Sequence, residues 1–333
     1  MSRYNNRPMR GEQIYLAPLG SGVGDVVVAL PALEWLTAQG AQTYLVARGP
    51  RQLGFDYAIP ALAGVVREPE VPPDAHYINL RDHSIQRNYD WYSEAFERDY
   101  PNFRINEIMA TICRDKGIKA DFATLPKLVF RPQAAAKDKV ILVPGTTSDF
   151  KALPSSTWRA LVALLRSEHI SPLILGEPDR SAVVADLIAD GIPHLGTPVI
   201  QDAIDIISSS RGCISVDTGL MHIAVQQNVP TVAVFNSVHT YYRAAAHCQP
   251  VFAPACAREC KMQISSEFPF PADYKEWIWW EGQYNYCRAF EQHCMSQIPA
   301  HDIFSHFCNL LQRLGLGIGQ GPLTNNLDGA ASR

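Results

Sequence analysis

The stretch CISVDTGLMHIAVQQNVPTVAVF (residues 213–235) decides the fold of this chain. It begins with a short β-rich run at 213–216, continues with a helical pattern over 218–227 and ends with an apolar strand at 231–235. A strand, a crossover helix and a second strand in this order form a βαβ unit, in which the two strands run parallel. The stretch therefore predicts a parallel sheet that is covered by helices.

The same alternation of strands and helices fills the chain on both sides of a polar linker at 131–139. Before the linker, helical patterns alternate with predicted strands at 14–19, 43–48, 76–81 and 126–130. After the linker, a second series begins with predicted strands at 140–144 and 172–177. We therefore predict an α/β protein with two Rossmann-like domains, over residues 11–134 and 135–298.

Composition excludes several classes of protein. Among the 333 residues 47% are hydrophobic and the net charge is -4, which excludes a largely disordered chain and a basic nucleic-acid-binding platform. No apolar run approaches the roughly 18 residues of a membrane span, and the polar start lacks the apolar core of a secretory signal. We therefore expect a cytoplasmic protein without a disulfide framework, and peripheral attachment at the inner membrane stays open.

A glycine-rich turn, Gly20-Ser-Gly22-Val-Gly24-Asp25, follows the first strand and opens a helix. A dinucleotide-binding fingerprint needs a third glycine where this chain has Asp25, and an acid at the end of the second strand, where it has Arg48. This departure disfavours a NAD-dependent oxidoreductase. At a strand's carboxyl end, Asp25 would face the crevice where open α/β sheets bind ligands, and it could accept a proton from a hydroxyl. Capping of the helix by the Asp25 carboxylate is an equally weighted alternative.

A second loop, Asp217-Thr218-Gly219-Leu220, opens the helix of the quoted stretch. Asp217 is predicted to cap this helix, and Gly219 lets a ligand approach the backbone closely. The free N–H groups of a helix start attract phosphate. His222 lies one turn further on, on the same side as Thr218. The pattern indicates an anion site, and a capped helix with a packed histidine is the alternative.

Two further strand ends carry polar groups. Thr146, Thr147 and Lys151 follow one of them, and this mixture of hydroxyls with one cation suits a diphosphate. Glu177 follows the other, where an acid can bind the hydroxyl pair of a ribose. The alternatives are a solvated lysine at the first and capping of the next helix by Asp179 at the second.

Together these segments resemble glycosyltransferase family 9, the heptosyltransferases. The resemblance covers about residues 14–311 and rests on GVGDVVVALPALEWL, PGTTSDFKALPSSTW, LILGEPDR and SVDTGLMHIAVQQNVPTVAVF. It implies the GT-B fold, in which an N-terminal domain binds the acceptor and a C-terminal domain binds an ADP-heptose donor across a cleft. It also implies inverting transfer without a catalytic metal, and a last helix at 299–314 that crosses back to the first domain.

The resemblance also implies roles for individual residues. Asp25 corresponds to the catalytic base and Lys151 to a lysine that binds the phosphates. The implied donor site consists of Thr146, Thr147, Lys151, Glu177, Asp217, Thr218, Gly219, Leu220 and His222. The acceptor-side candidates lie on the glycine loop and just past the strand at 76–81, and they are Gly22, Gly24, Arg81, Asp82 and His83.

A late segment departs from the usual family pattern. Thiolates of Cys256, Cys260, Cys287 and Cys294 can hold a structural zinc or iron, although neither pair has the usual two-residue spacing. Simple packing is the alternative for these cysteines. The aromatic stretch at 268–286 is interpreted either as an acceptor or subunit surface or as a local core.

The resemblance therefore implies a heptosyltransferase-like enzyme of lipopolysaccharide biosynthesis that requires no cofactor for catalysis. Its donor is a nucleotide-diphosphate sugar, and its acceptor is a hydroxyl of a glycan, a lipid-linked glycan or a protein. The open alternatives are a GT-B enzyme with another nucleotide sugar, including an epimerase, and a non-catalytic nucleotide-sugar-binding protein. The Gly- and Asn-rich tail at 315–333 is expected to be disordered.

Overall fold

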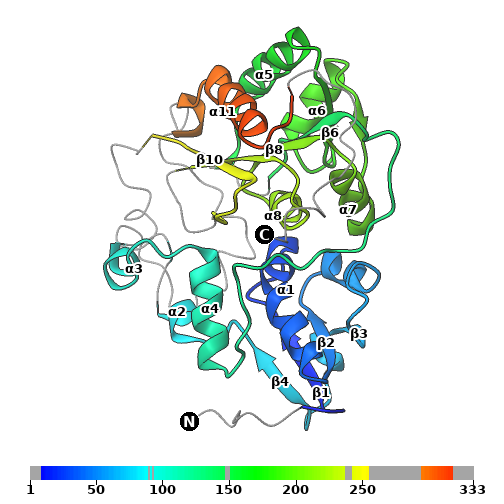
Figure 1. The fold of residues 1–333 in the computed structure, drawn as a ribbon, viewed down its shortest axis with the longest axis vertical. Helices are drawn as coiled ribbons and strands as arrows, with labels where there is room; N and C mark the ends of the chain where they lie inside the picture. The colour runs from blue at the N-terminus through cyan, green and yellow to red at the C-terminus, as the bar shows by residue number, and fades with distance from the viewer. Residues whose placement is uncertain are drawn as a thin grey trace.

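The computed structural model describes residues 9–88, 91, 94–146, 151–236, 242–254 and 294–317. These residues form two α/β domains that lie one above the other along the long axis of the molecule, with the first domain at the bottom of Figure 1. Each domain contains one parallel sheet, which confirms the predicted class of fold. Within the described ranges, no helix combines the length and the apolar character that a bilayer crossing requires.

The first domain is built on a parallel sheet in the order β3-β2-β1-β4. Its strands are β1 (Gln13–Ala17), β2 (Gln42–Ala47), β3 (Gly64–Arg67) and β4 (His76–Asn79). Helix α1 (Val23–Ala38) connects β1 to β2, and most of its residues are buried because neighbours contact it on several sides. The other elements are η1 (Pro50–Phe55), η2 (Glu68–Glu70), α2 (Ser84–Arg87), α3 (Glu94–Asp99) and α4 (Ile105–Asp115).

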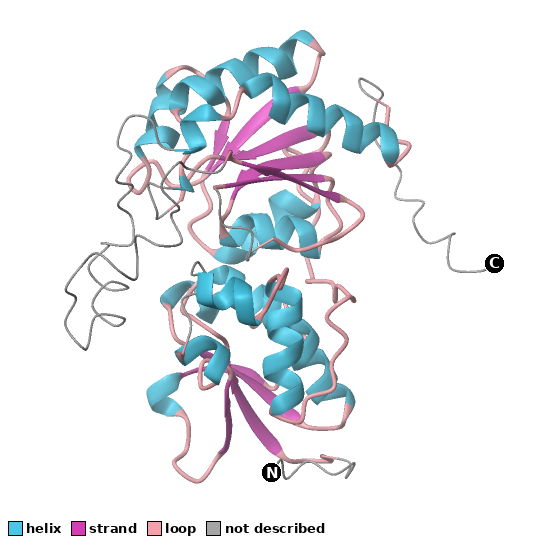
Figure 2. Cartoon of the chain, turned by 90° about the vertical axis from the view of Figure 1, so that its left-hand side faces the viewer, coloured by secondary structure: helices cyan, strands magenta, loops and turns pink. Residues whose placement is uncertain are grey.

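The second domain is built on a larger parallel sheet in the order β10-β9-β8-β5-β6-β7. Its strands are β5 (Lys139–Val143), β6 (Ser171–Leu175), β7 (His194–Leu195), β8 (Gly212–Val216), β9 (Thr231–Phe235) and β10 (Cys248–Phe252). Helices cover both faces of this sheet, as Figure 2 shows. They are α5 (Ser155–Ser167), α6 (Ala182–Ala189), α7 (Ile200–Ser208), α8 (Gly219–Gln226) and α11 (Ala300–Arg313), with a short turn η6 (Cys294–Gln297).

Side chains of the second domain hold the connection between the domains. The predicted strand at 126–130 does not form, and Gln227 instead accepts from the N–H of Leu128 and donates to its carbonyl, both at 2.9 Å. A little further on, the fully buried carboxylate of Asp205 accepts from the backbone N–H and the Nε of Arg131, at 2.9 and 2.8 Å. Because these bonds satisfy the backbone of an extended segment, it needs no neighbouring strand.

The last helix packs on the second domain, whereas the sequence predicted that it crosses back to the first. Its buried residues, Ile303, Phe307, Leu310 and Leu311, belong to the apolar cluster that fills the second domain. Helix α11 contacts α5, β9 and β10, and Figure 1 places it beside α5 at the end of the molecule away from the first domain. The amphipathic pattern predicted the helix correctly but could not tell which domain its apolar face covers.

Truncation of Phe307 should destabilise the second domain strongly. Its ring is fully buried against Gly212, where an added Cβ would lie 2.8 Å from the ring atoms. We expect Phe307→Ala to lower the free energy of unfolding by about 3–5 kcal/mol in urea titrations. Gln312→Ala, on an exposed position of the same helix, should change it by less than about 0.5 kcal/mol. Equal effects of the two substitutions would contradict the packing of α11 described here.

Candidate functional site

The two domains meet where the amino-terminal ends of α1 and α8 come into contact. A Cβ added to Gly24 would lie 2.8 Å from Cδ2 of His222, and one added to Gly219 would lie 2.9 Å from the backbone nitrogen of Gly24. Only glycine at both positions allows so close an approach. Figure 1 shows α1 directly beneath α8. The contact therefore joins the glycine loop of the first domain to the Asp217–Leu220 loop of the second.

Asp25 lies in the first turn of α1, three residues after the N-cap Gly22. Its Oδ2 accepts a hydrogen bond from the N–H of the N-cap residue Gly22 at 2.9 Å. The Asp25 carboxylate therefore does cap the helix, as the alternative interpretation of the sequence held. Although the side chain is partly open to solvent, burial between the domains raises its pKa to about 6. The Gly22 hydrogen bond and the positive charges of Arg48, Lys151 and Arg81 act in the opposite direction. A carboxylate that titrates there can accept a proton near neutral pH.

Lys151 and Asp217, both predicted as donor-binding residues, form an ion pair with 2.7 Å between Nζ and Oδ2. The sequence predicted that Asp217 caps α8, and this prediction is wrong. The N-cap is Thr218, whose hydroxyl accepts from the N–H of Met221 at 3.4 Å, because the Asp217 carboxylate is bound to the lysine. Both charged side chains are largely buried, with exposed fractions of 17% and 9%. The ion pair holds the ammonium group of Lys151 beside the start of α8.

His222 is buried one turn into α8 and packs against Gly24. Burial lowers its pKa to about 3, and the charges of Arg243 and Lys151 add to this effect against the opposing charge of Asp217. The imidazole is therefore neutral at pH 7. Within the described residues its Nδ1 is buried without a hydrogen-bond partner, which leaves a polar atom at the domain contact that a ligand can satisfy.

The other predicted donor residues lie at neighbouring strand ends. Thr146 follows β5, and Thr147 lies outside the described residues. Oε1 of Glu177, just past β6, accepts from the N–H and the hydroxyl of Thr197 at 3.0 and 3.4 Å. Glu177 is therefore fixed at the same carboxyl edge of the sheet as the start of α8.

The predicted acceptor residues separate into two groups. Arg81 is exposed and near enough to Asp25 to lower its pKa. His83 instead caps α2 by accepting from the N–H of Ile85 at 3.2 Å, and its Nε2 lies 3.1 Å from Asp115. Asp82 forms an ion pair with Arg87, and its carbonyl accepts from Lys116. The structure thus brings Arg81 to the site and uses Asp82 and His83 to anchor α2 and α4.

Two residues that follow β2 join the site without having been predicted as part of it: Arg48 comes directly after the strand, and Gln52 lies in η1. The guanidinium of Arg48 donates to the Pro18 carbonyl at 2.9 Å, to Asn79 at 2.8 Å and to Glu68 at 3.0 Å. Gln52 is fully buried beneath the glycine loop. The position of Arg48 directly after a predicted strand was a usable signal. The sequence was interpreted there only as lacking the acid that a dinucleotide-binding site needs. Gln52 gave no signal, because its partners in the glycine loop are 30 and 32 residues away.

The late cysteines are mostly beyond what the structure describes. Cys256, Cys260, Cys287 and the stretch at 268–286 lie outside the described residues. Cys294 is buried in η6 with the apolar cluster of the second domain. Among the described residues, no three His, Cys, Asp or Glu side chains are arranged to hold a metal ion.

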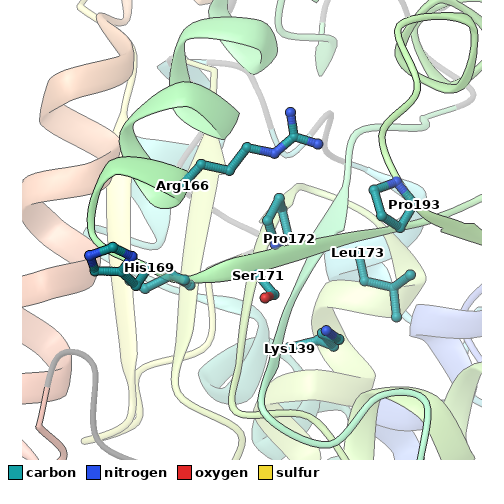
Figure 3. Close-up of a pocket in the computed structure, with 8 residues that line it drawn as sticks. Lys139, Arg166, His169, Ser171, Pro172, Leu173 and Pro193 are labelled. Carbon is teal, nitrogen blue, oxygen red and sulfur yellow. The ribbon is translucent and has the colours of Figure 1, made fainter.

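A surface hollow of about 390 Å³ lies at the opposite edge of the second sheet (Figure 3). Its lining comes from the start of β5, the end of α5 and the start of β6, and includes Lys139, Arg166, His169, Ser171, Pro172, Leu173 and Pro193. Because ligands of open α/β sheets bind at the carboxyl ends of the strands, this amino-terminal hollow is not the substrate site. It supplies a useful control position at Lys139.

The family model of glycosyltransferase family 9 (heptosyltransferase) matches residues 73–264. The chain belongs to this family. It is 21% identical over 164 residues to lipopolysaccharide heptosyltransferase 1 of Salmonella typhimurium, a match that covers 48% of this chain and 47% of the relative. The chain thus spans about half the length of that curated relative.

Solved structures of family members share the GT-B fold with this chain. The iron-containing dodecameric glycosyltransferase TibC of enterotoxigenic Escherichia coli aligns with a TM-score of 0.63 and 12% identity, over 92% of this chain and 77% of that one. The ADP-heptose lipopolysaccharide heptosyltransferase II of E. coli aligns with a TM-score of 0.57 and 13% identity, over 91% and 99%. These alignments confirm the predicted heptosyltransferase-like GT-B fold.

Asp25→Asn should stabilise the folded protein at neutral pH. An unfolded aspartate ionises near pH 3.8, whereas folded Asp25 ionises near pH 6, so the folded state holds an extra proton between these values. The contribution of Asp25 to the stability of the wild type therefore falls as pH rises from about 4 to 6, and the asparagine variant avoids this loss. We expect Asp25→Asn to be more stable by about 1–2 kcal/mol at pH 8, since solvent access reduces the effect of the full shift.

Urea unfolding at pH 8 and pH 4.5 checks this expectation. The stability difference between the two proteins should shrink toward zero at the lower pH, where Asp25 is protonated in both the folded and the unfolded chain to an increasing degree. A stability difference that does not change with pH would contradict a raised pKa of Asp25.

Proposed function

We propose that the protein is an inverting glycosyltransferase that moves a heptose or a similar sugar from a nucleotide-diphosphate donor to a hydroxyl of a glycan or lipopolysaccharide-type acceptor. The observation that carries the proposal is the position of Asp25, whose carboxylate titrates near pH 6 at the contact between α1 and α8 and within electrostatic reach of Lys151. Inverting glycosyl transfer needs a base for the acceptor hydroxyl and positive charge near the leaving diphosphate, and Asp25 and Lys151 are suited to these two tasks.

The second domain supplies the features of a diphosphate site. The N–H groups at the start of α8, around Gly219 and Leu220, carry the positive end of the helix dipole. The ammonium group of Lys151 donates to the carboxylate of Asp217, the residue before the N-cap of α8. A diphosphate would compete with that carboxylate for the ammonium group. Two relatives support an ADP-heptose-like donor, because the heptosyltransferase II of E. coli is named for ADP-heptose and TibC has been solved in complex with ADP-D-β-D-heptose.

In the proposed reaction, the acceptor hydroxyl loses its proton to Asp25 as its oxygen attacks the anomeric carbon. The bond between that carbon and the diphosphate oxygen breaks on the opposite face, so the configuration at the carbon inverts. The leaving nucleoside diphosphate gains negative charge, which Lys151 and the start of α8 stabilise. The chain thus offers a fixed cation and backbone donors for the task, and we propose that transfer needs no metal.

Substitutions at Asp25 and Lys151 should separate donor binding from chemistry. Lys151→Met should weaken binding of ADP and ADP-sugars by about 10–100-fold, because it removes a charge-assisted hydrogen bond. Asp25→Asn should keep donor affinity within about two-fold and lower the transfer rate by about 10²–10⁴-fold, because it removes the base. Calorimetric titration with ADP-, UDP- and GDP-sugars and assays of transfer to lipopolysaccharide-core acceptors measure both quantities.

The control for the charge effect is Lys139→Met at the opposite edge of the sheet, which should leave donor affinity unchanged. If wild-type protein binds none of the nucleotide sugars, the proposal is wrong. Conversion of the donor sugar in the absence of any acceptor would point to an epimerase instead.

A further inference from the structure

Gln52 is a fully buried amide that makes four hydrogen bonds to the backbone. Its Nε2 donates to the carbonyl oxygens of Gly20 and Gly22 at 3.0 and 2.8 Å. Its Oε1 accepts from the N–H groups of Arg48 and Gly49 at 2.7 and 3.3 Å. Two N–H groups on one side and two carbonyls on the other fix the orientation of the amide. Its hydrogen-bonding capacity is thus used to join the end of β2 to the glycine loop.

The glycine loop needs such support. Three of the residues between β1 and Asp25 are glycines, which have unusually wide conformational freedom and lose it on folding. Ser21 and Gly22 are exposed, so side-chain packing restricts the loop little from the solvent side. On its other side, the glycine loop is in direct contact with the turn after β2, since a Cβ added to Gly49 would lie 2.4 Å from the Ser21 carbonyl oxygen.

The same loop sets the position of Asp25. Gly22 is the N-cap of α1, and its N–H donates to the Asp25 carboxylate while its carbonyl accepts from Gln52. With hydrogen bonds on both its N–H and its C=O, Gly22 cannot change its backbone dihedrals freely, so the Gln52 amide helps to fix the residue to which the carboxylate is bonded. Gln52 thereby acts on Asp25 through one intervening residue and from a place that substrate does not reach.

We propose that Gln52 is a positioning residue for Asp25, whose amide holds the glycine loop in the conformation that presents the carboxylate at the domain contact. This inference rests on the proposed function insofar as Asp25 is taken as the base. Loss of the Gln52 amide should lower the rate of the chemical step and leave the affinity for the donor unchanged, because the proposed donor loop belongs to the other domain.

The test compares three variants of the 333-residue chain. Gln52→Met keeps the length of the side chain and removes every hydrogen bond. Gln52→Glu keeps the acceptors for Arg48 and Gly49 and replaces the donors that hold the loop. Thr231→Val is the matched control, because Thr231 is also fully buried and its hydroxyl donates to a backbone carbonyl, that of Val229, at 2.6 Å, but at the start of β9 in the second domain.

Hydrogen exchange followed by mass spectrometry measures the opening of the glycine loop, and steady-state kinetics measure the effect of that opening on transfer. In both Gln52 variants, exchange of residues 18–25 should accelerate by about ten-fold or more, whereas the control should leave this segment unchanged. The kcat for transfer should fall by about 10²-fold with the donor KM within about two-fold of wild type. A KM that rises in parallel with the fall in kcat would indicate general damage instead and would overturn the positioning role.

The outcomes distinguish this inference from the proposed function. Wild-type exchange of residues 18–25 in Gln52→Met overturns the inference whatever the enzyme does. Faster exchange with undiminished kcat overturns it as well, while transfer itself stands. If the wild-type chain binds no nucleotide sugar, the proposed function fails, and the exchange rates alone decide whether Gln52 holds the loop.

Discussion

The contact between α1 and α8 is the constraint on which the rest of the site depends. At Gly24 and Gly219 the two helix starts approach so closely that one added carbon atom on either residue would overlap the other domain. Each helix begins at the carboxyl end of a central strand, β1 or β8, so the contact joins the ligand-binding edges of both sheets. The extended connection, held by Gln227 and Asp205, keeps the domains in this arrangement.

The electrostatics of the site follow from this contact. Burial between the domains makes the charged form of Asp25 costly, whereas Arg48, Lys151 and Arg81 limit that cost, and the balance leaves the pKa of the carboxyl near 6. The same burial keeps His222 neutral. Charged groups of the two domains therefore influence one another directly, and a ligand that displaces Asp217 from Lys151 would alter the field at Asp25 as well.

Much of this arrangement could be predicted from the sequence, because parallel strands bring their carboxyl ends to one edge and the residues that follow them must gather there. Asp25, Lys151 and the loop before α8 were found in this way. The side on which α11 packs was not, since an amphipathic face does not specify which apolar surface it covers. Gln52 was missed because its meaning depends on bonds to the glycine loop, which is distant in the chain. Three of the late cysteines lie outside the described residues.

The central claim is that Asp25, held at this contact, accepts the proton of the acceptor hydroxyl. The pH dependence of kcat/KM for transfer between pH 4.5 and 8.5 tests it most directly, because this quantity reports the ionisation of essential groups in the free enzyme. The account predicts a rate that rises with pH through an apparent pKa of about 6 and then levels off, with no such rise in the residual activity of Asp25→Asn. A profile that is flat through pH 6, or the same rise in Asp25→Asn, would contradict it.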